Sequence, residues 1–373
     1  MTGARTSANG HRASFRATIV VPTIREPSIG RFLEQWAVEF RGHRVIVVED
    51  NPQRTFALPA WVEHYSWQDV DERLGDLAWI IPRRSDCVRS FGYYLAAQEP
   101  CDFVVTLDDD CYPEEIYERS FLSLVRDALD RRWDDDRWWS TLDGRVRPRG
   151  FPYEIREQSL PTLIHHGLWS NVPDLDARTQ LRLPNHRLRP ATSVQRVPHG
   201  RFFPMCGMNL AFRPAMIPAL YFLLMGKHRD GSVWPYDRFG DIWAGVFAKK
   251  VADHLGFVVT SGAPSVLHSR ASNPEVNLQK ETPGYPVNEA LWRRVEAVGL
   301  SAETVAGCYQ QLADNLDMRG EYWTTVKSAM KVWASLFAIP LERAKPAAAA
   351  PAARAPSAWP ERSPRPLQPR SPR

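Results

Sequence analysis

The sequence lacks several features that would assign it to common protein classes. Its five cysteines are dispersed without a CxxC pair, which disfavours a zinc motif and favours reduced thiols over a disulfide framework. No apolar run approaches the roughly 20 residues that a membrane-spanning helix needs. The first 16 residues are polar, without the apolar segment of a secretory signal. We therefore predict a cytoplasmic protein with no integral membrane segment.

A basic field over the folded part of the chain is also absent. The formal net charge is +4, but positions 342–373 hold seven basic and two acidic residues. This segment therefore carries a net charge of +5 and leaves about −1 for all the rest. A nucleic-acid-binding domain concentrates positive charge on one surface. We therefore expect no nucleic acid among the partners.

Composition divides the 373 residues into four parts. Residues 1–16 are predicted to be a flexible N-terminus, 17–285 a catalytic domain and 286–340 a helical appendage. Residues 341–373 are rich in Ala, Pro and Arg, and such a segment cannot bury enough apolar surface to fold, so we predict disorder. The high Ala, Arg and Pro content is typical of proteins encoded by GC-rich bacterial DNA, so we predict a bacterial origin.

Strand and helix patterns alternate in the first third of the chain. Nearly continuous apolar runs predict buried parallel strands at 17–24, 43–50, 77–82 and 102–110. Helical patterns separate them at 30–40, 86–98 and 115–131. The alternation predicts a mostly parallel α/β sheet with flanking helices, and such sheets bind ligands beyond the carboxyl ends of their strands.

The rest of the chain is less regular. Residues 132–200 show little periodicity, and we expect functional loops there. We predict strands at 202–212 and 257–268, helices at 214–225 and 239–255, and helical structure over 287–338.

Three carboxylates follow one predicted strand. Asp108, Asp109 and Asp110 come directly after Phe-Val-Val-Thr-Leu. Adjacent carboxylates repel one another unless a cation neutralises them, and Mg²⁺ or Mn²⁺ prefers carboxylate oxygens together with substrate phosphates. The spacing of Asp108 and Asp110 resembles the DxD motif of nucleotide-sugar enzymes with a GT-A-like sheet. We therefore predict that these two residues bind Mn²⁺ or Mg²⁺, with a solvated acidic turn as the alternative.

Two further features bear on this site. A second triplet, Asp134 to Asp136, has no preceding apolar strand and is predicted to be a solvated loop. His268 ends the strand-like segment SVLHS and is the third predicted metal ligand, with a purely structural hydrogen bond as the alternative. No flavin is expected, because no G-x-G-x-x-G follows the first strand.

Several long motifs occur in a fixed order over residues 17–285: VVPTIR (20–25), TLDDDC (106–111), HGLWSNVPDLDARTQL (166–181), FPMCGMNLAF (203–212), DIWAG (241–245), DHLG (253–256) and HSRASNPEVNLQKE (268–281). In these motifs the chain resembles the reversibly glycosylated polypeptides, whose plant members include UDP-arabinopyranose mutases. The Ala/Pro-rich tail lies outside the resemblance.

The resemblance implies a UDP-sugar site and a reactive arginine. Arg156 corresponds to the arginine that the family reversibly glycosylates, although an arginine paired with phosphate, Glu154 or Glu157 is the alternative. Asp241 and Asp174, together with Asp176, are implied to orient sugar hydroxyls or to move protons. The remaining residues implied to bind the UDP-sugar are Thr23, Arg25, Asp50, Asp109, Trp169, Asn171, Asn209 and Ser269.

One departure from the plant pattern falls near this site. The plant RYDDMW segment corresponds to residues 238–243, where Gly240 replaces the first aspartate and only Asp241 remains. This change bears on sugar preference.

The resemblance implies a divalent-metal-dependent UDP-sugar mutase, with UDP-L-arabinopyranose to UDP-L-arabinofuranose as the leading reaction and self-glycosylation on Arg156. A glycosyltransferase that acts on itself, a glycan or a small molecule is the second reading. A non-catalytic UDP-sugar-binding scaffold is the third, and assembly into homo- or hetero-oligomers remains open.

Overall fold

The computed structural model describes residues 15–142, 146–270 and 272–337. Most of the predicted flexible N-terminus and all of the predicted disordered tail lie outside the described residues. The strands are β1 Ala17–Thr23, β2 Arg44–Glu49, β3 Glu63–Tyr65, β4 Phe103–Leu107, β5 Cys111–Tyr112, β6 Arg132–Asp134, β7 Ser159–Asn171, β8 Val194–Arg196, β9 Asn209–Phe212 and β10 Val258–His268.

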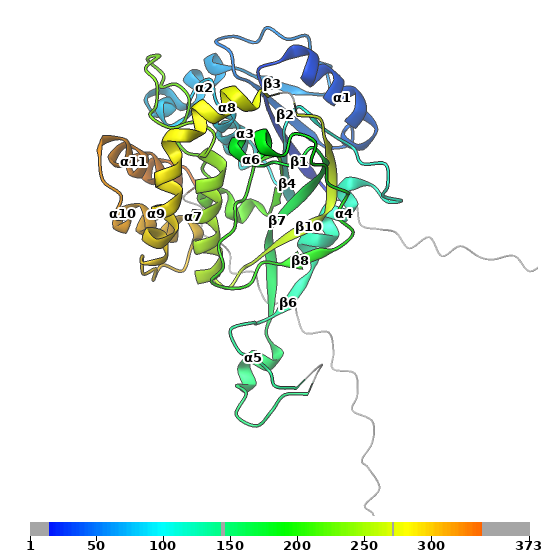
Figure 1. The fold of residues 1–373 in the computed structure, drawn as a ribbon, viewed down its shortest axis with the longest axis vertical. Coiled ribbons are helices and arrows are strands. Elements are labelled where there is room, and N and C mark those ends of the chain that lie inside the picture. Colours follow the sequence, from blue (N-terminus) through cyan, green and yellow to red (C-terminus); the bar gives the residue numbers. More distant parts are fainter. Residues whose placement is uncertain (1–14, 143–145, 271, 338–373) are drawn as a thin grey trace, which may run out of the picture. The chain divides into compact units, whose positions relative to one another are not determined.

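Helices connect most of these strands (Figure 1). The α-helices are α1 Glu26–Phe40, α2 Trp67–Leu74, α3 Arg89–Ala96, α4 Phe121–Asp130, α5 Tyr153–Glu157, α6 Ala177–Arg182, α7 Gly240–His254, α8 Pro274–Glu281, α9 Tyr285–Glu296, α10 Val305–Asn315 and α11 Glu321–Ser335. Short 3₁₀ helices are η1 Gly75–Ile80, η2 Asp86–Val88, η3 Pro214–Ala219 and η4 Thr282–Gly284. No helix within the described ranges has the length and apolar character that crossing a membrane requires.

One sheet organises the chain, with its main path in the order β3-β2-β1-β4-β9-β7-β10-β5. Strands β3, β2, β1 and β4 run parallel, and β7 runs parallel to β10. Strand β9 lies antiparallel between β4 and β7. The predicted α/β class, a sheet with flanking helices and a C-terminal helical region, is confirmed.

Alternating side chains of the strands pack on two layers of helices. In β1, Ile19 and Val21 belong to a buried cluster that also holds the apolar faces of α1 and α4. Val20, between them, points to the opposite cluster, which includes α3, α7 and the C-terminal helices α9 to α11. This period of two is what a strand covered on both faces requires.

Three predicted elements have a different structure. The apolar run at 77–82 forms part of η1 rather than a strand, since a short buried run does not distinguish the two by periodicity. Within 202–212 only Asn209–Phe212 pairs as a strand, and Pro204 interrupts the earlier part of that run. The predicted helix at 214–225 is limited to η3, which contains Pro218.

The region 132–200 is not as irregular as predicted. It holds β7, a strand of 13 residues that pairs with both β9 and β10. Its sequence SLPTLIHHGLWSN mixes polar and apolar residues without a regular alternation, so the strand could not be predicted from the sequence and depends on neighbours distant in the chain. The second acidic triplet is not a fully solvated loop either, because Asp134 ends β6 and the buried Asp135 accepts hydrogen bonds from Arg137.

Candidate active site

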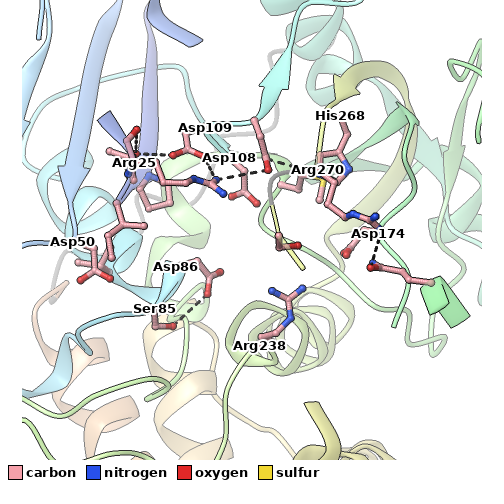
Figure 2. A pocket seen from close by; sticks show the side chains of 18 residues that line it. Arg25, Asp50, Ser85, Asp86, Asp108, Asp109, Asp174, Arg238, His268 and Arg270 are labelled. Carbon is pink, nitrogen blue, oxygen red and sulfur yellow. Dashed lines mark hydrogen bonds and ion pairs between the residues drawn. The ribbon is translucent and has the colours of Figure 1, made fainter. Parts of the chain in front are cut away.

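A pocket lies at the edge of the sheet where the parallel strands end (Figure 2). Thr23 ends β1, Asp50 follows β2 and the acidic triplet follows β4. The carboxyl ends of β1, β2 and β4 meet at one edge because these strands are parallel. The main pocket has a volume of about 210 Å³, and an adjoining pocket of about 370 Å³ shares part of its wall and extends to Cys206, Asp237, Asp241 and Lys280.

The middle carboxylate of the triplet is tied to β1. The Thr23 hydroxyl donates to Asp109 Oδ2 at 2.6 Å, and the Arg25 guanidinium donates to Asp109 Oδ1. Burial raises the pKa of Asp109, while the hydrogen bond from Arg25 opposes that rise. The Arg25 Nη2 atom also lies 3.7 Å from Asp110 Oδ2. Asp109 therefore positions Arg25 at the pocket.

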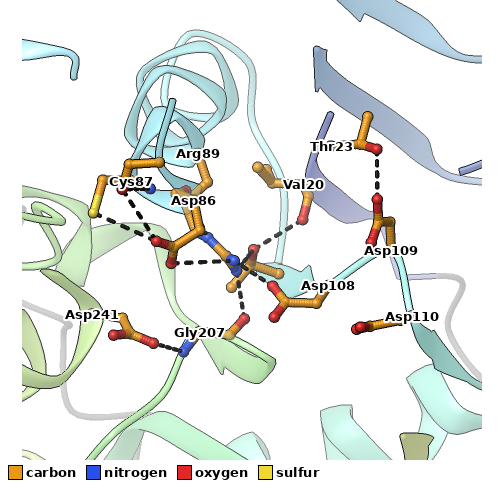
Figure 3. Close-up of polar contacts among 12 residues, drawn as sticks. Val20, Thr23, Asp86, Cys87, Arg89, Asp108, Asp109, Asp110, Gly207 and Asp241 are labelled. Carbon is orange, nitrogen blue, oxygen red and sulfur yellow. Dashed lines mark hydrogen bonds and ion pairs between the residues drawn. The ribbon is translucent and has the colours of Figure 1, made fainter. Parts of the chain in front are cut away.

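The first carboxylate is held by a buried arginine (Figure 3). Arg89, which is fully buried on α3, donates to Asp108 Oδ1, to Thr106 Oγ1 at 3.0 Å and to the Gly207 carbonyl at 2.5 Å. The nearby Asp108 and Asp86 carboxylates outweigh the effect of burial and raise the pKa of Arg89. Asp108 is therefore directed to Arg89.

The third carboxylate faces His268. Asp110 Oδ1 lies 3.8 Å from His268 Nε2. The other ring nitrogen, Nδ1, donates to the Val172 carbonyl at 2.6 Å, because a carbonyl only accepts. In the neutral ring Nε2 therefore keeps its lone pair and points it toward a carboxylate. A backbone carbonyl that fixes the tautomer in this way is typical of metal-ligating histidines.

The predicted set of three metal ligands is not assembled. Across the ranges that the structure describes, no three Asp, Glu, His or Cys side chains are grouped closely enough to hold a metal ion. Asp108 is paired with Arg89, whereas Asp110 and His268 face each other at the pocket. This pair still fits Mg²⁺ or Mn²⁺, because such ions commonly bind one or two protein groups and complete their shell with waters and substrate phosphates.

Asp50 closes the pocket on the β2 side. Its Oδ1 atom accepts hydrogen bonds from Trp67 Nε1 at 2.7 Å and from the Arg84 backbone N–H at 2.9 Å. Burial raises its pKa to about 6, although these two donors favour the carboxylate. Asp50 is thus held in one orientation at the pocket wall.

Two of the predicted catalytic carboxylates also reach the pockets. Asp174 lines both, and burial raises its pKa while Arg238 opposes the rise. Asp241 lines the adjoining pocket from the first turn of α7, where Oδ2 accepts from the Gly207 backbone N–H at 2.9 Å.

Other predicted site residues do not line either pocket. Asn209 is buried and donates to the carbonyls of Leu168 and Pro264, and Asn171 donates to the His268 carbonyl. Both therefore brace the sheet around the site. Three predicted residues remain. Trp169 packs on His166, and the Ser269 backbone N–H donates to the Asp110 carbonyl. Asp176 is the exposed N-cap of α6.

Arg156, the predicted glycosylation site, does not lie at the pocket. It lies on α5, in an extension beyond β6 (Figure 1). Its Nη2 atom donates to the carbonyls of Pro148 and Phe151, and its guanidinium lies 4.2 Å from the Tyr153 ring centre. These contacts hold the extension together and do not bring Arg156 to the pocket.

The sequence reasoning missed several pocket residues. Asp86, Arg238 and Arg270 line the main pocket together with Gln180. Arg238 has a positive φ of 67°, which is uncommon for a residue with a side chain, and donates to Glu281 at 3.1 Å. Asp86 begins η2 and is separated from the apolar run 77–82 by Arg83, Arg84 and Ser85, so it had no strand-end signal, and Arg89 gave none within its helical pattern.

The molecule is an α/β protein with an acidic pocket at the carboxyl ends of its parallel strands. A family model described as "Reversibly glycosylated polypeptide" matches residues 15–339, and the chain belongs to this family. It is 36% identical over 333 residues to "Probable UDP-arabinopyranose mutase 1" of Solanum tuberosum, covering 84% of this chain and 88% of the relative. It is 35% identical over 333 residues to "UDP-arabinopyranose mutase 1" of Arabidopsis thaliana, covering 84% and 90%.

The predicted family and its enzyme class are confirmed by these matches. Both relatives are plant proteins, so they lend no support to the predicted bacterial origin. Among solved structures, a mannosyltransferase from Pyrobaculum calidifontis in complex with GDP-Man and Mn²⁺ matches 86% of this chain and 70% of its own, with 13% identity and a TM-score of 0.35.

Proposed function

We propose that this protein is a divalent-metal-dependent UDP-sugar mutase that interconverts pyranose and furanose forms. UDP-L-arabinopyranose and UDP-L-arabinofuranose are the leading pair, a choice supported by the names of the relatives. The observation that carries the metal dependence is the meeting of Asp110 and His268 at the pocket. That pair suits an ion that binds the diphosphate of a nucleotide sugar.

The residues around the pocket have roles that follow from their chemistry. Asp110 and His268 would hold Mn²⁺ or Mg²⁺, which when bound supplies positive charge to the diphosphate as the anomeric C–O bond breaks. Arg25, Arg238 and Arg270 line the same pocket and can donate to phosphate oxygens. These donors would keep UDP in place while the sugar recloses through another ring oxygen.

The nucleotide and the sugar are proposed to occupy different walls. Thr23, Asp50 and Asp109 lie on the β1 and β2 side and are proposed to bind the uridine part. Asp174 and Asp241 line the adjoining pocket and are proposed to contact the sugar hydroxyls.

Incubation with a panel of UDP-sugars and Mn²⁺, followed by chromatography of ring-form isomers, tests the function. We expect pyranose and furanose forms to interconvert without any acceptor, and a chelator to stop the reaction. Turnover that requires an added glycan or small-molecule acceptor would identify a glycosyltransferase instead. Binding of UDP without turnover of any sugar in the panel would identify a scaffold.

Self-glycosylation on Arg156 is a separate proposal that the family resemblance supports. Because Arg156 lies outside the pocket, we expect an Arg156→Lys variant to lose incorporation of radiolabelled sugar and to keep mutase turnover within about twofold. The exposed Arg149 on the same extension offers a matched control, since Arg149→Lys should change neither quantity. Loss of turnover in Arg156→Lys, with the fold intact, would place the arginine on the reaction path.

A further inference from the structure

The adjoining pocket has more carboxylates than cations. Its lining includes Arg84, Arg238 and Lys280 as cations. The lining carboxylates are Asp50, Asp86, Asp108, Asp174, Asp237 and Asp241. Some of these charges are already paired. Lys280 lies 2.8 Å from Asp237, and Asp108 is paired with the buried Arg89, which does not line the pocket. A bound diphosphate would add further negative charge, so this pocket favours retention of a proton.

Asp86 and Asp241 face the same space from different elements (Figure 3). Asp241 Oδ1 and Oδ2 accept hydrogen bonds from the backbone N–H groups of Ile242 and Gly207 at 2.8 and 2.9 Å. Asp86 is held more loosely, by the Ser85 hydroxyl at 3.3 Å and by Arg89 Nη2 at 3.7 Å. Neither set of contacts neutralises both carboxylates.

Burial and the neighbouring carboxylates favour the protonated form of this pair. Burial first, and then the Asp86 carboxylate, raise the pKa of Asp241 to about 7. Burial also raises the pKa of Asp86, although Arg89 opposes that rise. The other titratable or charged groups around the pair come from the neighbouring segments and are Cys87, Asp108, Asp174, Cys206, Asp237, Arg238 and Lys280.

Ring exchange in a sugar requires two opposite proton transfers. The hydroxyl on C4 must lose its proton as it bonds to C1, and the oxygen on C5 must gain a proton as it leaves C1. A carboxyl pair with a single proton can perform both transfers, because one member accepts while the other donates. The pair then holds one proton again, so no net proton is consumed.

We propose that Asp86 and Asp241 form this proton-sharing pair, accepting the proton of the C4 hydroxyl and delivering one to the C5 oxygen of the bound sugar. The proposal rests on the proposed mutase function and adds Asp86 to its machinery. Asp110 and His268 keep the roles described above, and Cys206 has none in this step.

The test compares the pH dependence of kcat/KM in the full chain and in three variants. Asp86→Asn should lower kcat by about a hundredfold or more, the usual range for loss of an acid–base group. In the pH profile of its remaining activity, the upper limb should shift to lower pH. The reason is that Asp241 no longer faces a like charge, which lowers the pKa of its carboxyl group. Asp86→Glu retains a carboxyl and should keep that limb near its original position.

A matched control and a second readout separate the possible failures. Asp76→Asn, which changes an exposed aspartate on η1, should leave rate and pH profile unchanged.

Infrared spectra should show a carboxylic-acid C=O band that titrates near pH 7 and disappears in both Asp86→Asn and Asp241→Asn. The proposal that the two residues share a proton would be overturned by any of three results. These are full kcat in Asp86→Asn, an upper limb of its pH profile that does not move, and persistence of the infrared band in both variants. A wild-type chain that shows this band but interconverts no ring forms would refute the mutase function and leave the shared proton supported.

Discussion

Replacing Asp110 with asparagine is expected to lower kcat/KM by about a hundredfold to a thousandfold. Asp110 and His268 face one space at the head of the pocket, and an amide binds a hard divalent cation much more weakly than a carboxylate does. Without that ion the diphosphate leaving group would develop charge with no metal beside it, and the loss of one such electrostatic contact commonly costs a hundredfold to a thousandfold. Calorimetry with Mn²⁺ in the presence of UDP should show weaker metal binding in the same variant.

The second acidic triplet offers a matched control for this prediction. Asp134 ends β6, is exposed and pairs with Arg147 at 3.1 Å. Asp134→Asn should therefore leave both Mn²⁺ affinity and turnover within about twofold of the original. Full turnover in Asp110→Asn would contradict the assignment of the acidic strand end as the metal site.

Replacing Arg89 with methionine is expected to destabilise the fold by about 3 kcal/mol. Arg89 is fully buried, and its loss leaves the Asp108 carboxylate without its partner and the Thr106 hydroxyl and Gly207 carbonyl without a donor. Breaking a buried ion pair by removing one member costs about 3–5 kcal/mol, and partial exposure of Asp108 favours the lower end. Thermal unfolding should shift downward by about 4 °C.

Two comparisons distinguish pairing from general packing. Arg319→Met removes an exposed arginine that pairs with Asp317 at 3.2 Å, and should cost less than about 1 kcal/mol. Combining Arg89→Met with Asp108→Leu removes both charges, so part of the lost stability should return while activity stays low. An unfolding midpoint for Arg89→Met equal to that of the wild type would show that the buried pair contributes nothing to stability.

The acidic end of β4 was predictable because it depends on local sequence. A continuous apolar run specifies a strand covered on both faces, and residues that follow such a strand lie at the edge of the sheet where ligands bind. Strands β1, β2, β4 and β10 and helix α7 were expected at nearly their observed positions for the same reason. The motifs over 17–285 sufficed to identify the family.

Elements whose stability depends on distant partners were not predictable. Strand β7 mixes polar and apolar residues without a regular alternation, and it forms because β9 and β10 pair with its backbone. The run at 77–82 lies partly in η1, which contacts α11, and Ala78, Ile80 and Ile81 are buried there without a strand partner.

The family, four of the strands and three consecutive carboxylates at one strand end follow from the residues alone. What each carboxylate contacts depends on folding, which pairs Asp108 with Arg89, Asp109 with Arg25 and Asp110 with His268. It also brought Asp86 and Asp241 to one pocket from segments far apart in the chain. Strand formation follows from the hydrophobicity of neighbouring residues, whereas the partner and protonation of a carboxylate depend on charges that only folding brings close together.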